Sequence, residues 1–350
     1  MNKTAKPASP SLGRAVIIIM MMMLGGKYWT EAVYCQTKVG TTAADFLMIP
    51  VGPRASGMGG AFTATANDVT SAYWNAAGLS RIGRDEFTAS FSNWIAGTKL
   101  SWFGLNYALD EDDAIGLSIN QLDYGQEEIT TEGQPNGTGQ YWSAADIALG
   151  LSYSRNLTDR FSVGGTVKYI NEKIYNESAS AFALDVGLLF YTQLQGLRIG
   201  MNISNFGTEM QLAGQDLLLP GNIDPAHTGT NNTIATNLQT DSWPLPLIFT
   251  VGLGYDVVNT DQWDWTVATD AVYPNNQSAY LNLGSELSWS KVLYLRGGYY
   301  SLFKKNEEGG LSAGVGVKYD FGSFYTKVDY SYTNFGIFDP INRISISIGL

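Results

Sequence analysis

The sequence predicts an all-β protein, an antiparallel transmembrane β-barrel of about fourteen strands whose lumen is filled by an N-terminal plug. Three observations predict this fold. An export signal opens the chain, residues from 86 onward alternate between apolar and polar side chains, and charged residues keep to one face of each predicted strand. This pattern suits a barrel with lipid outside and a polar lumen inside.

Composition excludes two other classes of protein. Only 15% of the 350 residues are charged, which is low for a soluble domain, while 45% are hydrophobic. A helical membrane protein is excluded because no apolar run reaches roughly 18 residues. No linker or shift in composition divides the chain, which favours one large closed unit.

Residues 1–35 are predicted to be a signal peptide. Lys3, Lys6 and Arg14 form a positive n-region, and residues 15–24 form an apolar h-region too short to span a bilayer. Cleavage is expected after Cys35, which leaves the mature chain without cysteine and therefore without disulfides. A lipid anchor on Cys35 is the alternative, but the residues before it are a poor lipobox.

The charge balance argues against one class of partner. The formal net charge is −11, so the protein is not expected to bind nucleic acid.

Alternation of period two marks the strands. In the last one, Ile344, Ile346 and Ile348 interleave with Ser345 and Ser347. Fourteen such segments follow the N-terminal region, so the barrel is assigned to residues 86–350. They are expected to start near 86, 99, 114, 142, 161, 181, 197, 245, 263, 279, 292, 310, 324 and 341.

The connections between these strands alternate in length. One set is short, whereas the other includes two long excursions, 124–140 and 207–244. Outer-membrane barrels have short periplasmic turns and long extracellular loops. The expected location is therefore the outer membrane of a Gram-negative (diderm) bacterium, with lipid as the surrounding partner.

Charged residues give an independent test, because they played no part in choosing each strand's apolar face. Lys99 and Lys173 are the exceptions, and both are expected near strand ends, where a charge on the lipid face costs little. The following residues all fall on the predicted lumen side: Asp146, Lys168, Asp185, Arg198, Asp256, Asp264, Asp270, Glu286, Arg296, Lys318, Lys327, Asp329 and Arg343.

Tryptophans are the remaining membrane signal, because an outer-membrane barrel carries aromatic girdles at both interfaces. Six are expected at strand ends: Trp94, Trp142, Trp243, Trp263, Trp265 and Trp289. A secreted sandwich or propeller also alternates, but it explains neither the loop asymmetry nor the outward apolar faces.

Residues 36–85 do not alternate and are predicted to be a plug, or hatch, inside the barrel. Burial is expected because the segment is rich in apolar side chains. These are Phe46, Leu47, Met48, Ile49, Val51, Met58, Phe62 and Trp74.

The same segment carries a family resemblance. Residues 46–62 (FLMIPVGPRASGMGGAF), followed by Asn67-Asp68 and residues 72–79 (AYWNAAGL), resemble the N-terminal signature of the PorV/PorQ family, within the FadL-like fourteen-stranded outer-membrane barrels. The family commonly has Asn-Pro-Ala-Gly where this chain has Asn75-Ala76-Ala77-Gly78. The missing proline removes a fixed φ and puts only the local turn in doubt.

The signature residues are interpreted as holding the plug, with direct contact to a ligand or partner as the alternative. Glycines allow close backbone approach or positive φ, and Arg54 and Asp68 can pair with charges of the lumen. The candidate plug residues are Pro50, Arg54, Gly57, Gly59, Gly60, Asp68, Trp74, Asn75 and Gly78.

The resemblance implies two functions. PorV-type members serve type IX protein secretion and bind cargo C-terminal signal domains and the translocon. FadL-type members pass hydrophobic small molecules, so a hydrophobic ligand or detergent in the lumen is the alternative expectation. For the first function, the candidate partner-binding loop contains Leu212, Leu217, Leu218, Leu219 and Ile223, which are expected to be exposed.

No catalytic constellation is found, so the protein is predicted not to be an enzyme and to need no cofactor or metal. His227 is the only histidine and lies in an Asn/Thr-rich loop. The acidic run 110–113 lacks the spacing of an EF-hand, and Gly314 to Gly316 lie within a predicted strand rather than in a phosphate loop.

Overall fold

The computed structural model describes residues 40–221, 234–304 and 310–350. The signal peptide predicted for residues 1–35, with its cleavage site, lies outside these residues. Contacts divide the chain into residues 1–37 and 38–350, and everything described below belongs to the second unit.

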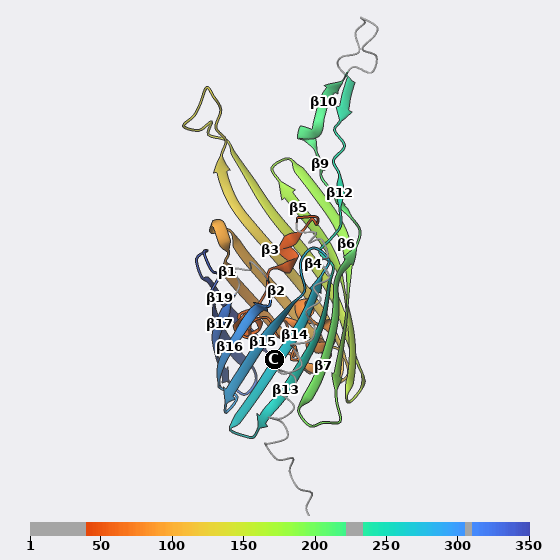
Figure 1. The fold of residues 1–350 in the computed structure, drawn as a ribbon, viewed down its shortest axis with the longest axis vertical. Helices are drawn as coiled ribbons and strands as arrows, with labels where there is room; N and C mark the ends of the chain where they lie inside the picture. The colour runs from red at the N-terminus through yellow and green to blue at the C-terminus, as the bar shows by residue number, and fades with distance from the viewer. Residues whose placement is uncertain (1–39, 222–233, 305–309) are drawn as a thin grey trace, which may run out of the picture. The chain divides into compact units, whose positions relative to one another are not determined.

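Fourteen antiparallel strands form a closed barrel (Figure 1). Each strand pairs with its neighbours along the chain, β7 pairs with β13 across the long excursion, and β1 pairs with β19 to close the ring. The strands are β1 (Glu86–Asn93), β2 (Lys99–Ala108), β3 (Asp113–Glu128), β4 (Tyr141–Thr158), β5 (Phe161–Ile174), β6 (Glu177–Tyr191), β7 (Leu197–Gly207), β13 (Ile248–Asn259), β14 (Trp263–Pro274), β15 (Tyr280–Trp289), β16 (Leu293–Leu302), β17 (Leu311–Asp320), β18 (Tyr325–Thr333) and β19 (Ile341–Gly349).

The predicted fold class is confirmed, and every predicted strand starts within a few residues of an observed one. The largest difference is at the first long excursion, where β3 continues to Glu128. The predicted loop 124–140 is therefore too long. Gly125, with φ +83°, lies at a register shift in the β3–β4 ladder, and this bulge interrupts the alternation that would have revealed the extension.

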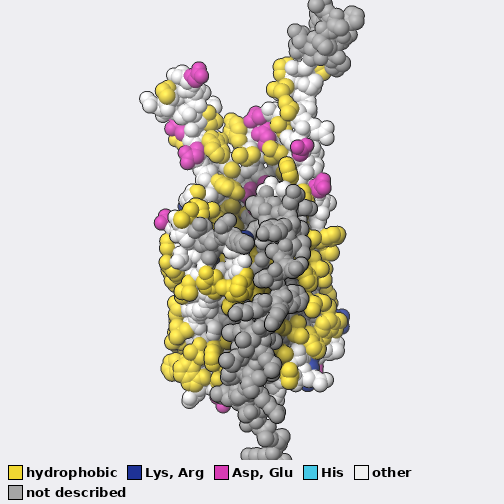
Figure 2. Space-filling view, in the orientation of Figure 1, with side chains coloured by type: hydrophobic (Ala, Val, Ile, Leu, Met, Phe, Trp, Pro, Cys, Tyr) yellow, Lys and Arg dark blue, Asp and Glu magenta, His cyan; other side chains and the backbone are white. Residues whose placement is uncertain are grey.

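The two faces of the strands differ in exposure as the alternation predicts. In β19, Ile344 and Ile346 are 52% and 43% exposed, whereas Arg343 and Ser345 are 3% and 4% exposed. On the face shown in Figure 2, apolar side chains cover much of the visible barrel surface, and most of the visible acidic residues lie towards the loop end. The apolar face is therefore the outer one, where it meets lipid.

All the charged residues assigned to the lumen are buried or half-buried, so the predicted parity is correct. Lys99 begins β2, and Lys173 lies next to the end of β5. Both are exposed, as expected for positions near strand ends.

The barrel has a turn end and a loop end. Glu86 pairs with Gly349, so the first strand begins and the last strand ends at the turn end. The second long excursion carries short elements rather than one irregular loop: β8 (Met210–Gln211), β9 (Ala213–Gly214), η5 (Gln215–Leu217), β10 (Leu218–Gly221), β11 (Ile234–Asn237) and β12 (Ser242–Trp243). β10 pairs with β11 in a small ladder that projects beyond the barrel strands (Figure 1).

Five of the six tryptophans expected at strand ends are exposed there or in β12: Trp142, Trp243, Trp263, Trp265 and Trp289. Trp94 differs from the prediction. It follows β1, is half-buried and packs with the interior cluster beside Phe335. Its position at a strand end could not distinguish a side chain that turns outward to lipid from one that turns over the lumen. Among the described residues, no helix is long and apolar enough to cross a membrane.

Candidate functional site

The N-terminal segment, residues 40–85, packs against the inner face of the barrel (Figure 1). Its short helices are η2 (Asp45–Met48), α2 (Pro53–Gly57), α3 (Ser71–Trp74) and η3 (Ala76–Arg81). Pro53 begins α2, where the missing N–H is tolerated and the fixed φ suits a helix. The segment is largely helical and irregular, so it fills the interior without joining the sheet.

A buried ionic network joins this segment to the wall. The guanidinium of Arg54 donates two hydrogen bonds to Glu286 of β15, at 2.9 and 2.8 Å, and a third to Asp68 at 3.0 Å. Arg54 also donates to Asn67 and lies over the ring of Phe62. Two of the predicted plug residues, Arg54 and Asp68, therefore meet in one contact, and Glu286 is their partner on the wall.

The network continues along the wall. Arg296 of β16 donates to Glu286 and to Asp329 of β18, each at 2.6 Å, and Lys327 lies 3.4 Å from Asp329. Three cations therefore face three carboxylates in a water-poor interior, where an unpaired charge would be expensive. Burial opposes ionisation of Asp68, but the Arg54 guanidinium outweighs it and lowers the pKa of Asp68 below its ordinary value.

Two further polar side chains fix the backbone of the segment. One carboxylate oxygen of Asp270 accepts hydrogen bonds from the backbone N–H groups of Phe62 and Thr63, at 3.0 and 2.9 Å. Asn75 donates to the carbonyl oxygens of Thr63 and of Leu188 on β6, at 2.8 and 3.0 Å. Asn75 thus holds the segment to itself and to the wall.

Three of the four predicted plug glycines, Gly57, Gly59 and Gly78, lie where backbones touch. A Cβ on Gly59, whose φ is +63°, would lie 2.5 Å from the backbone nitrogen of Tyr299. A Cβ on Gly57 would lie 3.1 Å from Gly314, and one on Gly78 would lie 2.3 Å from the carbonyl oxygen of Ala66. Gly60, at φ +75°, occupies the left-handed region that favours glycine.

We expect Gly59→Ala to destabilise the barrel by more than about 1 kcal/mol, because the new methyl group meets backbone that cannot move aside. Gly83→Ala is the matched control, since Gly83 has a similar φ of +66° but no atom within 4 Å of its Cβ position. The measurement is the temperature at which the folded, fast-migrating band disappears on a gel. Equal shifts for the two variants would assign the effect to φ strain alone.

The two remaining plug residues lie at the apolar side of the segment. The indole nitrogen of Trp74 donates to the carbonyl oxygen of Val51 at 3.1 Å, and its ring packs edge-on against Phe62. Pro50 lines both cavities described below. The predicted plug residues therefore lie at contacts within the N-terminal segment, at contacts between it and the wall, or, for Pro50, at the edge of the cavities.

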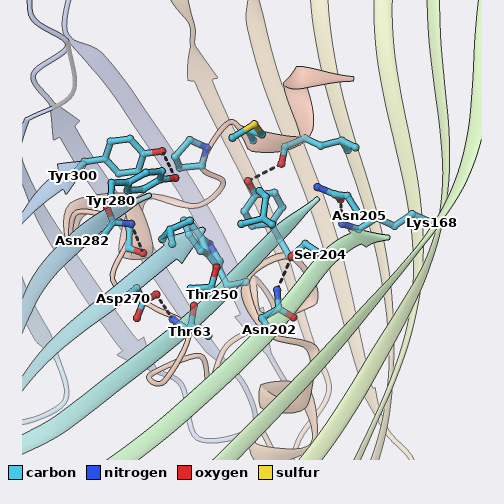
Figure 3. Close-up of a pocket in the computed structure, with 18 residues that line it drawn as sticks. Thr63, Lys168, Asn202, Ser204, Asn205, Thr250, Asp270, Tyr280, Asn282 and Tyr300 are labelled. Atoms are coloured by element: carbon cyan, nitrogen blue, oxygen red, sulfur yellow. Dashed lines mark hydrogen bonds between the residues drawn. The ribbon is translucent and has the colours of Figure 1, made fainter. Parts of the chain in front are cut away.

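A small cavity of about 50 Å³, lined by both polar and apolar side chains, lies between the segment and the wall (Figure 3). Lys168 donates to Asn205 at 2.9 Å and lies 2.5 Å from Asp185, and Tyr280 and Tyr300 are in hydroxyl contact across another side of the cavity. A space of this size suits water or a small solute and not a hydrophobic ligand.

A larger cavity of about 490 Å³ opens on the loop side of the segment. Phe46 and Ile49 line it from the segment, Trp94 and Phe335 from two loops, and Arg343 from β19. The sequence predicted Arg343 only as a lumen charge and Trp94 only as a member of an interfacial aromatic girdle. The sequence does place two aromatic residues, Trp94 and Phe335, just after the loop ends of β1 and β18. These two residues meet only because the barrel closes, which brings both strands beside β19.

The candidate loop residues are not all exposed. Leu218 and Leu219 in β10 are 49% and 47% exposed, as expected for a free apolar surface. Leu212 and Leu217 are half-buried, and Leu212 packs against the interior cluster, so the prediction that they are exposed is wrong. The excursion folds back on the barrel wall through β9, which pairs with β6. Ile223 lies outside the described residues.

No group of three or more metal-ligating side chains occurs within residues 40–221, 234–304 and 310–350. The acidic turn at 110–113 uses its first carboxylate internally, because Asp110 accepts hydrogen bonds from the backbone N–H groups of Asp112 and Asp113. These hydrogen bonds lower the pKa of Asp110. His227 lies outside the described residues.

Comparison with known proteins gives one family match. The model of a family described as type IX secretion system protein PorV matches residues 33–239. A search of curated protein sequences found no significant match.

Solved structures share the fold. The toluene transporter TodX of Pseudomonas putida is 12% identical with a TM-score of 0.53, and the match covers 85% of this chain and 97% of that one. The CymD monoaromatic hydrocarbon channel is 12% identical with a TM-score of 0.52, covering 86% and 97%. The TM-scores show a common barrel fold, and at 12% identity the likeness shows the fold alone.

Proposed function

Because the chain belongs to the family of the type IX secretion protein PorV, we propose that it is a secretion component whose extracellular loops bind cargo or translocon partners. It is an outer-membrane β-barrel of a Gram-negative bacterium. The resemblance drawn from the N-terminal signature is thereby confirmed at the level of the family.

The observation that carries this proposal is the projecting β10–β11 ladder. Leu218 pairs with Asn237 and Leu219 pairs with Thr236, so the two leucines point to opposite sides of a two-stranded ribbon. A ladder of only two strands has no second layer to cover its side chains, so both leucines remain about half exposed. An apolar ribbon held away from the barrel is suited to docking another protein.

The lumen supports the same assignment. In this proposal the N-terminal segment is a plug, held by the Arg54–Glu286–Asp68 contacts and by the glycines that seat it on the wall. An apolar solute would have to pass charged groups that are already paired with each other. These paired charges therefore favour a barrel that works through its loops over one that works through its lumen.

We expect the double substitution Leu218→Ser and Leu219→Ser to reduce co-purification of cargo or translocon proteins about tenfold or more, since apolar anchors dominate such interfaces. The barrel should stay folded because these residues lie outside its strands. Affinity purification from the native membrane, followed by quantification of the bound proteins, is the measurement.

Leu194→Ser is the matched control. Leu194 is exposed in the turn between β6 and β7, at the opposite end of the barrel. If both variants lose partners equally, or if neither does, the β10–β11 ladder is not the docking surface.

A second candidate function is passage of an apolar small molecule. It is favoured by the cavity of about 490 Å³, whose lining includes Phe46, Ile49 and Leu122, and by the fold shared with a toluene transporter and a monoaromatic hydrocarbon channel. Toluene entry into vesicles containing the purified protein tests it. Entry no faster than into empty vesicles would remove this candidate.

A further inference from the structure

Arg343 differs from the other buried cations of the lumen. It is 3% exposed and lies on the inner face of β19, near its loop end. Arg54, Arg296 and Arg198 each meet a carboxylate, at Glu286, Glu286 and Asp256 respectively. Within the described part of the chain, Arg343 meets none.

The hydrogen bonds of Arg343 leave most of its donors unused. One nitrogen, Nη1, donates to the hydroxyl of Thr333 at 3.1 Å, and Nε has no partner among the described residues. A guanidinium carries five donors in a planar fork. Removing such a group from water without an anion is unfavourable, so the arrangement favours an incoming acceptor.

Arg343 lines the loop-side cavity of about 490 Å³, together with its hydrogen-bond partner Thr333. Trp94 lies against it, with the Cζ atom of Arg343 5.6 Å from the ring centroid, and Phe335 packs edge-on against Trp94 at 5.3 Å. Phe46 and Leu122 extend the apolar wall. The cavity therefore combines one cationic fork with an aromatic and aliphatic surface.

Among the described lining residues, the carboxylate in the lining is not paired with Arg343. Asp45 is the carboxylate that lines the cavity among the described residues, and it accepts hydrogen bonds from Thr42 and Asn276 at 2.7 and 3.2 Å.

We propose that this cavity binds an organic anion, a carboxylate carried on an apolar body, with Arg343 gripping the carboxylate and the Trp94–Phe335 pair holding the body. Arginine and carboxylate match in a two-pronged geometry, which gives direction as well as affinity. A cavity of this volume holds a small organic ligand or a few residues of a peptide. The inference goes beyond the proposed secretion role and does not depend on it.

The first test compares probes on the intact protein in an uncharged detergent. Titration calorimetry with 4-phenylbutyrate, 4-phenylbutanol and 4-phenylbutylamine varies only the head group. We expect the acid to bind about tenfold or more tightly than the alcohol, and the amine to bind least. Equal affinities for the acid and the alcohol, or no binding of the acid, would overturn the proposal.

The second test uses variants. Arg343→Gln should remove the preference for the acid, whereas Arg343→Lys should keep part of it, because the charge remains but the fork is lost. Arg155→Gln is the control, since Arg155 is exposed at the turn end and away from the cavity. A folded Arg343→Gln protein that still prefers the acid would contradict the assignment. If that variant does not fold, the comparison of probes on the unmodified protein decides.

The third arm distinguishes the source of the carboxylate. A short apolar peptide with a free C-terminus is compared with its C-terminal amide as a competitor of 4-phenylbutyrate. Stronger competition by the free peptide identifies a polypeptide end as a ligand. Equal, weak competition by both peptides identifies a small organic acid.

Discussion

Arginine in place of Leu184 or Leu151 is expected to block assembly of the barrel in the membrane. Both leucines lie on the outer face and are 42% and 56% exposed. Each pairs with Val167 of β5, so they lie level with one another on adjacent ladders, well inside their strands. An arginine facing lipid near the midplane costs about 2–4 kcal/mol, a large share of the stability of a typical domain.

The control for this prediction is Leu157→Arg. Leu157 is equally exposed but lies next to the turn end of β4, where the same change costs about 0–1 kcal/mol. Inward neighbours such as Asp185 are unsuitable controls because Asp185 pairs with Lys168 inside the barrel. The readout is the fraction of membrane-inserted protein that migrates as a folded band without heating. Similar fractions for Leu151→Arg and Leu157→Arg would refute the depth dependence.

The barrel was predictable because one physical rule acts on every strand. Because lipid lies outside the barrel and a polar interior lies inside, apolar and polar side chains must alternate along each strand. This alternation can be read in each strand separately. β19 shows this alternation without interruption, and its outer isoleucines and inner serines lie as expected. Closure followed from the even number of strands and the alternating length of the connections.

The loop end was less predictable because its residues, unlike those of the strands, do not all lie between lipid and lumen. The β3–β4 hairpin continues past the membrane in water, and the bulge at Gly125 changes which side chains face inward. Leu212 folds against the wall, whereas Leu218 stays exposed, although the sequence presents both as leucines in a polar loop. Their burial depends on which strand edge the excursion meets.

The lumen contacts show the same limit. The sequence identifies Arg54 as a cation that needs an anion, and the alternation places Glu286 on the inner face. To predict that these two residues pair, one must also know how deep the N-terminal segment sits in the lumen and how β15 is aligned with its neighbouring strands. The roles assigned to the signature residues, and the boundaries of the plug, stay predictions.

Arg54→Met is expected to loosen the N-terminal segment. The six charges of the network balance in the native protein: Arg54, Arg296 and Lys327 face Asp68, Glu286 and Asp329. Loss of Arg54 leaves one buried negative charge in excess. Breaking a buried pair costs about 3–5 kcal/mol, and we expect a value near 3 because Arg296 still pairs with Glu286.

The loosening is measured as the labelling rate of a buried thiol. Ser71→Cys suits this purpose because Ser71 is fully buried in α3 and its hydroxyl has no hydrogen-bond partner among the described residues. If opening of the segment limits labelling, a loss of about 3 kcal/mol raises the rate on the order of 100-fold.

A compensating change separates charge imbalance from loss of packing. Adding Asp68→Asn to Arg54→Met restores neutrality without restoring contacts, so the labelling rate should fall part of the way back. Arg155→Met, at an exposed site, should leave the rate unchanged. If the compensating change gives no recovery, the effect of Arg54 comes from its packing over Phe62 and its hydrogen bonds, and the electrostatic account of how the segment is held is wrong.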